Sequence, residues 1–97
     1  MSIVGTYPYD TKPNGYQQLA VSSTAVALTV PAGTTRAVCK VATNAIRYRD
    51  DGVNPTATVG YPVAANGELE LHGTEQLSAF KAIRQSSDAT LDILYYK

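Results

Sequence analysis

Apolar and polar residues alternate along several short stretches of the chain, with the period of two that is typical of half-buried β-strands. The clearest example closes the chain, where Leu91, Ile93 and Tyr95 alternate with Asp92 and other residues of the opposite face. The same alternation occurs in residues 25–30, 37–41 and 68–71. No stretch of about 11 residues keeps the i, i+3, i+4, i+7 spacing of an amphipathic helix. The pattern therefore predicts a β-protein.

Turn-forming dipeptides separate the alternating stretches at intervals that suit short antiparallel strands. Asn66-Gly67 predicts a type I′ hairpin leading into 68–72. Gly60 and Pro62 interrupt the weakly apolar stretch 57–65, which favours an edge strand or a bulge there. A helical turn is expected around 74–78. The predicted strands are residues 17–30, 35–42, 45–49, 57–65, 68–72, 77–84 and 89–96.

These elements predict an all-β fold, a single antiparallel β-sandwich over residues 17–97, with the jelly roll as one candidate topology. Residues 1–16 contain Pro and Gly and show no periodicity, so we expect an extended N-terminal arm outside the core. We expect the core to consist mainly of apolar residues from the inward faces of the strands: Val26, Leu28, Val41, Ile46, Leu69, Leu71, Phe80, Ile83, Leu91 and Ile93.

Composition narrows the classes of function. The 97 residues carry eight basic and eight acidic side chains, so the formal net charge is zero. This balance disfavours nucleic-acid binding and a polybasic membrane patch. Charged residues make up 16%, below the usual ~25%, and a weakly charged surface favours self-association. The first ten residues lack the pattern of a secretory signal, and no apolar stretch approaches the ~20 residues of a membrane span.

The loop after the third predicted strand carries the densest group of charges. Asp50, Asp51 and Asn54 offer oxygen atoms that a hard cation could bind, but Asp, Gly and Asn also make tight turns. The spacing lacks the pattern of a calcium-binding loop, which favours the turn. Arg47 and Arg49 lie on one strand face, and we expect them to pair with the two aspartates or with a neighbouring subunit.

The remaining reactive side chains do not form a catalytic motif. His72 and Glu70 share a strand face and could form a general base, yet a solvated histidine at a strand end is the simpler interpretation. Cys39 alternates with Ala37 and Val41, which indicates a small buried hydrophobic residue. A single cysteine also excludes an intrachain disulfide. We expect no enzymatic activity, no cofactor, no metal and no small-molecule substrate.

Seven tyrosines supply most of the aromatic surface. They could form a platform for stacking sugars, or they could line the core and protein interfaces, which the absence of Trp favours. Tyr7, Tyr9 and Tyr16 lie in the predicted arm, where they would anchor it on another chain.

One part of the chain resembles a known group of proteins. The segment IRYRDDGVNPTATVGYP at 46–62 contains an R-x-R-x-D-G-x-x-P-T loop, and Leu77–Ile83 fits a φ-x-x-F-x-x-I pattern. With the opening PAGTTRAVCKVA at 31–42 and the closing L-x-φ-x-Y strand, these features are similar to small virion proteins of tailed bacteriophages. The resemblance covers about residues 24–97 and leaves the arm unmatched.

The resemblance implies a non-enzymatic β-sandwich component of the virion, made in the host bacterial cytoplasm. Our first hypothesis is a capsid decoration or cement protein that binds itself and the major capsid protein. A head–tail neck or tail accessory protein is the alternative, and a module that binds carbohydrate or a host surface is another. The expected partner interface consists of Tyr7, Tyr9, Tyr16, Arg47, Arg49, Asp50 and Asp51.

Overall fold

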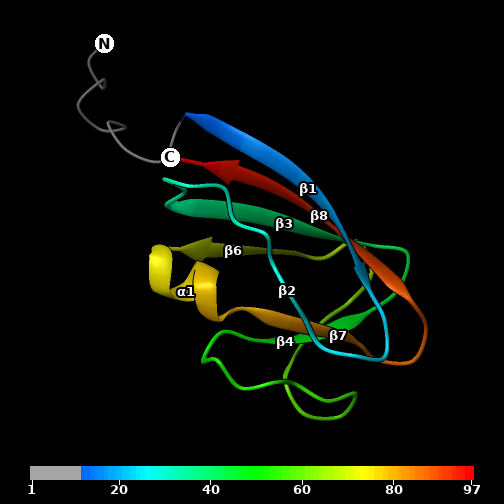
Figure 1. Ribbon diagram of the computed structural model, residues 1–97. Helices are drawn as coiled ribbons and strands as arrows, with labels where there is room; N and C mark the ends of the chain where they lie inside the picture. Colours follow the sequence, from blue (N-terminus) through cyan, green and yellow to red (C-terminus); the bar gives the residue numbers. More distant parts are fainter. Residues whose placement is uncertain (1–11) are drawn as a thin grey trace.

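Two four-stranded antiparallel sheets pack face to face in the computed structural model, which describes residues 12–97 (Figure 1). The first sheet has the order β1-β8-β3-β6 and the second has the order β2-β7-β4-β5. This is the strand order of a jelly roll, so the predicted antiparallel sandwich is confirmed. The elements are β1 (Pro13–Val21), β2 (Val26–Ala27), β3 (Arg36–Ala42), β4 (Ile46–Arg49), β5 (Tyr61–Val63), β6 (Glu68–His72), α1 (Thr74–Ala79), β7 (Lys81–Arg84) and β8 (Ala89–Tyr96).

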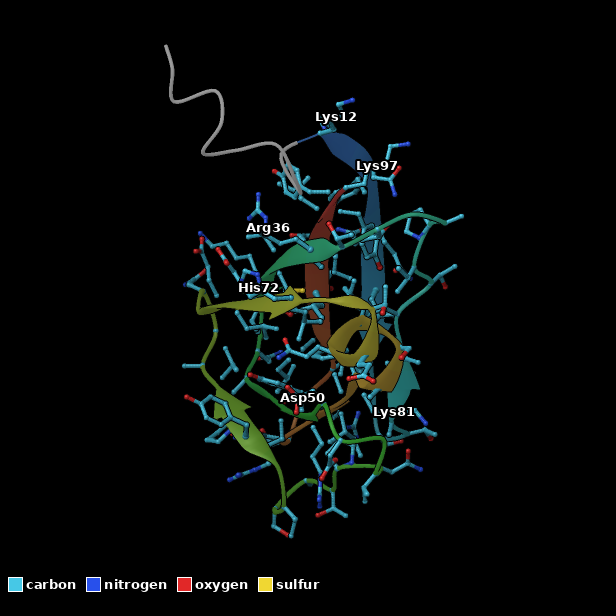
Figure 2. The ribbon with its side chains drawn as sticks, turned by 90° about the vertical axis from the view of Figure 1, so that its left-hand side faces the viewer. Lys12, Arg36, Asp50, His72, Lys81 and Lys97 are labelled. Atoms are coloured by element: carbon cyan, nitrogen blue, oxygen red, sulfur yellow. The ribbon has the colours of Figure 1, made fainter. Side chains whose placement is uncertain are left out.

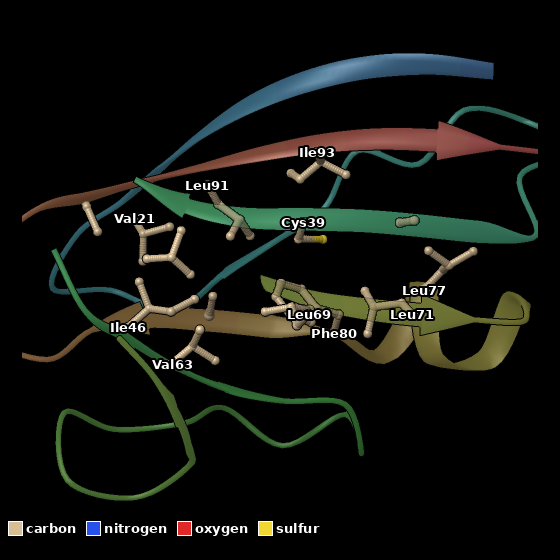
Figure 3. Packing of buried hydrophobic residues seen from close by; sticks show 14 of the residues in the cluster. Val21, Cys39, Ile46, Val63, Leu69, Leu71, Leu77, Phe80, Leu91 and Ile93 are labelled. Atoms are coloured by element: carbon tan, nitrogen blue, oxygen red, sulfur yellow. The ribbon is translucent and has the colours of Figure 1, made fainter. Parts of the chain in front are cut away.

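The core lies between the sheets and is closed at one end by Leu77 of α1 (Figure 3). Eight of the ten predicted core residues are buried, while Val26 and Leu28 are half-buried and pack against the margin of the core. Tyr95 is the largest fully buried side chain, in agreement with the alternation along β8. Because β8 pairs along its length with β1 and β3, its inward residues fill the centre of the sandwich.

The predicted boundary between arm and sandwich needs a correction. β1 begins at Pro13, so residues 13–16 belong to the first sheet, while residues 1–11 lie outside the described part of the chain. The start of this strand lacks an alternating pattern because its inward positions carry Gly15 and Gln17 instead of apolar side chains. Gln17 Oε1 accepts hydrogen bonds from the Tyr95 hydroxyl, at 2.6 Å, and from the Thr29 amide, at 3.1 Å.

Two further sequence predictions are wrong in detail. Residues 17–30 do not form one strand, because the chain leaves the first sheet after Val21 and enters the second at Val26. Asn66-Gly67 does not close a hairpin, because the strands on either side, β5 and β6, belong to different sheets. The turn instead spans residues 64–67, where the Gly67 amide donates to the Ala64 carbonyl at 2.9 Å and Asn66 has φ of 70°.

The predicted edge strand and helical turn are both present. β5 is shorter than the expected 57–65 but lies at the edge of the second sheet, where Pro62 is tolerated. α1 covers the expected turn and ends at Ala79; the next residue, Phe80, has an extended backbone, with φ of −63° and ψ of 133°, and redirects the chain into β7. The predicted strand 77–84 is therefore confined to residues 81–84.

Candidate functional site

A concavity lies beside paired strands β4 and β5 of the second sheet. A hollow of about 380 Å³, which we call the tyrosine hollow, is lined by Tyr48, Arg49, Asp50, Asp51, Gly60 and Tyr61. Asp50 follows the last residue of β4, below β6 in the view of Figure 2. Strand pairing places Tyr48 directly opposite Tyr61. The hollow is therefore formed by residues that are close in sequence, with at most 13 positions between any two of them. Three of the predicted interface residues meet here.

Two arginines hold the loop that borders the tyrosine hollow. Arg49 binds both carboxylate oxygens of Asp51, with Nε donating to Oδ1 at 3.0 Å, and the Val53 amide donates to the same oxygen at 3.3 Å. Gly52 has φ of 82°, which confirms the predicted tight turn at Asp51-Gly52. Arg47 donates to the carbonyls of Ala57 and Gly60 at 3.0 and 2.9 Å. The loop is thus fixed by charge-assisted hydrogen bonds.

The electrostatics of the hollow follow from these contacts. The hydrogen bonds from Arg49 lower the pKa of Asp51 to about 2, so this carboxylate is charged across the physiological range. Burial, together with the nearby charge of Asp50, raises the pKa of Tyr48, whose hydroxyl stays protonated. The predicted pairing of Arg49 with an aspartate of the loop is confirmed, and Arg47 donates to backbone carbonyls of the same loop.

Two aromatic contacts define the wall of the hollow. The ring centroids of Tyr48 and Tyr61 lie 5.4 Å apart with an interplanar angle of 52°, and Tyr48 also packs on buried Phe80 at 5.2 Å. Tyr48 is half-buried, while Tyr61 is 66% exposed. The pair therefore links the core to an accessible aromatic ring.

A second surface feature crosses the outer face of the first sheet, the face turned away from the core. Strand register aligns Tyr16 of β1, Leu94 of β8 and Val38 of β3 in what we call the outer row. Tyr16 is 60% exposed and Leu94 is 46% exposed. Polar groups flank this row. The Tyr16 hydroxyl donates to Asp92 at 2.9 Å, and the Arg36 guanidinium lies 4.3 Å from the centre of the Tyr96 ring.

The predicted interface residues thus fall in two places. Arg47, Arg49, Asp50 and Asp51 gather around the tyrosine hollow, whereas Tyr16 lies on the other sheet. Tyr7 and Tyr9 lie outside the described residues. Sequence reasoning missed Leu94 as a surface residue of interest, although the alternation along 91–95 already placed it on the outward face.

The other reactive side chains do not line the tyrosine hollow. His72 Nε2 lies 3.0 Å from Glu70 Oε1 on the exposed face of β6, and Glu70 is also 4.0 Å from Arg36. Cys39 is fully buried, as predicted, and burial raises the pKa of its thiol to about 12. Within residues 12–97, no group of three His, Cys, Asp or Glu side chains is arranged to hold a metal ion.

Comparison of the chain with protein-family models, with curated proteins and with solved structures finds no match. None of the helical segments between residues 12 and 97 has the length and apolar character to cross a bilayer.

Proposed function

We propose that this protein is a non-enzymatic structural protein of a tailed-bacteriophage virion, which binds the major capsid protein as a repeated subunit and stabilises the head. The observation that carries the proposal is the outer row. Tyr16 and Leu94 are large apolar side chains held in register on the regular face of a sheet. An apolar centre with a polar margin is the usual composition of a protein interface.

The position of β1 extends this surface. β1 is an edge strand, and Lys12 at its start exchanges backbone hydrogen bonds with Lys97 at 3.1 and 2.9 Å. The described part of the chain therefore begins at the edge of the sheet that carries the outer row. A fully extended segment of 11 residues would span at most about 36–40 Å. The outer row and the predicted arm would then act as one continuous interface.

Fold and charge support the same proposal. The jelly roll occurs in viral capsid proteins as well as in lectins, so the strand order is compatible with the proposal without determining it. A net charge of zero lets many copies lie side by side on a lattice without mutual repulsion. The proposal also takes up the resemblance of the motifs at 47–56 and in the closing strand to small phage virion proteins, which rests on the sequence pattern alone.

The experiment is a binding assay with heads of the encoding phage prepared without this protein. Purified protein is added, bound copies are counted by quantitative mass spectrometry, and the heat resistance of the heads is measured. A capsid decoration protein should bind in proportion to the number of capsomers and raise the heat resistance. Saturation at a single ring of copies would identify a neck or tail component instead, and absence of binding would refute the virion proposal.

Substitutions test whether the outer row makes the contact. Leu94→Arg should weaken binding to heads by about tenfold or more, because a charge would be buried in the interface. Val53→Arg is the matched control, since Val53 is 50% exposed and lies in the loop beside the second sheet. Equal binding by both variants would show that the outer row is not the contact surface.

A further inference from the structure

We infer that the tyrosine hollow is a binding site for a neutral saccharide. The inference does not rest on the proposed virion function, because it uses the second sheet, and the outer row belongs to the first. It rests on three observations: an exposed aromatic ring that packs on a second ring, hydrogen-bond donors and acceptors beside that ring, and a border held in place by the protein's own contacts.

The aromatic ring of Tyr61 provides the apolar platform. The C–H faces of a sugar ring pack on aromatic faces, and 66% of Tyr61 is accessible for such a contact. Tyr48 supports the ring of Tyr61 at 5.4 Å and is itself supported by Phe80 at 5.2 Å. The platform is therefore anchored to the core, which reduces the side-chain entropy lost when a ligand binds.

The polar groups match hydroxyls, which donate and accept hydrogen bonds at the same time. Asp50 lines the hollow and has no hydrogen-bond partner among residues 12–97, so its carboxylate is open to hydroxyl donors. Arg49 directs Nε and one terminal nitrogen at Asp51, which leaves further guanidinium N–H groups for hydroxyl acceptors. Ligand hydroxyls could therefore donate to Asp50 and accept from Arg49.

The backbone around the hollow is also held in place. Arg47 fixes the carbonyls of Ala57 and Gly60, and Pro55 of the same loop is buried. Gly60 has φ of 144°, and an added Cβ there would lie 3.1 Å from Pro55 and 3.2 Å from the Cβ of Arg47. A wall this closely packed is preorganised for a ligand.

Charge selects the class of ligand. One arginine and two aspartates give the hollow a net charge of −1, which disfavours phosphates and acidic sugars. A basic side chain from a partner would meet the Arg49 guanidinium in the same hollow, and Asp51 is already neutralised by that arginine. A neutral ligand rich in hydroxyls can hydrogen-bond to both the carboxylates and the guanidinium without such repulsion.

The size of the hollow sets the expected affinity. About 380 Å³ is at the lower end of the ~300–1,000 Å³ typical of ligand pockets, so one or two sugar rings would fit. A site that takes one or two sugar rings makes few contacts, so we expect weak binding of a single saccharide. Repetition of the protein on a particle would raise the overall avidity by orders of magnitude.

The test is an NMR titration of the ¹⁵N-labelled full-length protein with three neutral disaccharides: maltose, lactose and chitobiose. At least one of them should shift the amide signals of residues 48–51 and 60–61. Tyr61→Ala should abolish these shifts, and Tyr61→Phe should retain them, because the ring and not the hydroxyl is the platform. Asp50→Asn should weaken binding by about tenfold. Tyr16→Ala is the matched control, since Tyr16 is 60% exposed on the other sheet.

Three results would overturn the inference. The first is the absence of shifts with all three disaccharides, and the second is shifts that persist in Tyr61→Ala. The third is a stronger response of the same amides to N-acetyl-lysine methylamide, which would identify a site for a basic side chain. Tyr61→Ala should bind phage heads like the wild type, so failure of the saccharide site and failure of the virion proposal are distinguishable.

Discussion

Phe80 is the residue whose truncation most directly tests the architecture. It is fully buried where α1 passes into β7, and its ring lies 5.2 Å from that of Tyr48. Replacing it with Ala removes the ring from the centre of the core and leaves Tyr48 without its support. The sandwich should lose packing between its two sheets, and the tyrosine hollow should lose its foundation.

The magnitude follows from the size of the cavity and of the domain. Complete removal of a buried Phe ring costs about 3–5 kcal/mol, which includes the transfer of the ring and the cavity left behind. The aromatic contact with Tyr48 places this site toward the upper half of that range, since such pairs add about 0.5–1.5 kcal/mol. A folded domain has a total stability of about 5–15 kcal/mol, so the variant should lose a large fraction of it.

Urea denaturation followed by far-UV circular dichroism measures this change. Phe80→Ala should lower the urea midpoint with little change in slope, or reduce the melting temperature by roughly 12–40 °C. Phe80→Leu is the control that keeps most of the volume, and it should lose less than about 1.5 kcal/mol. A loss below about 1 kcal/mol for Phe80→Ala would refute the burial of this ring and the packing described for the core.

Three other predictions concern the loop, its ion pair and the arm. Gly60→Ala should destabilise the protein by about 1–3 kcal/mol in urea denaturation and abolish saccharide binding. Gly52→Asn is the control and should change the stability only slightly, because Asn tolerates the φ of 82° and no atom lies within 4 Å of an added Cβ. Asp51 has its pKa lowered from 3.8 to about 2, so its stabilising contribution is complete above pH 3.8 and is lost as the pH falls through about 2. Asp51→Asn should therefore lose less stability between pH 4 and pH 2 than the wild type in thermal melts, and an equal loss would contradict the ion pair. Deletion of residues 1–11 should leave the melting temperature nearly unchanged and weaken binding to phage heads, and unchanged binding would exclude the arm as an assembly element.

The strands that alternation predicts best are those with a continuous row of inward apolar residues. β3, β6 and β8 lie within a residue or so of the predicted 35–42, 68–72 and 89–96. Each of these strands has one face on the core and one on solvent, so apolar and polar residues alternate along its sequence. Alternation does not predict the start of β1, because Gly15 and Gln17 occupy its inward positions. This part of the strand is held instead by hydrogen bonds from Tyr95 and Thr29, which are distant in sequence, to Gln17.

The wrong hairpin has a similar cause. Asn66 adopts the positive φ that its side chain tolerates, so the turn itself is readable from the sequence. What the dipeptide does not specify is the partner of each strand, which tertiary packing decides. The Asn66 amide donates to the Val41 carbonyl at 2.7 Å, and the Val41 amide donates to the Gly67 carbonyl at 2.8 Å. These bonds extend the pairing of β3 with β6 in place of a local hairpin.

In the candidate site too, local contacts could be predicted from the sequence and contacts that depend on strand pairing could not. The pairing of Arg49 with Asp51 is local, since the two residues are two positions apart, and it could be predicted. The meeting of Tyr48 with Tyr61 depends on the register of β4 with β5, which closes an 11-residue loop between them. The sequence supplies the tyrosines as candidates for a sugar platform, but only the fold shows which two lie together.

If both proposed surfaces bind their ligands, they should do so independently of each other. The outer row lies on the outer face of the first sheet, and the tyrosine hollow lies at the β4–β5 edge of the second. A subunit docked through the outer row would therefore leave the hollow uncovered, and each particle would display many copies of it. Because the sites share no residue, their variants should act independently. Leu94→Arg should lose head binding and keep the saccharide response, Tyr61→Ala should show the reverse, and loss of both functions in either variant would mean that the two surfaces are one.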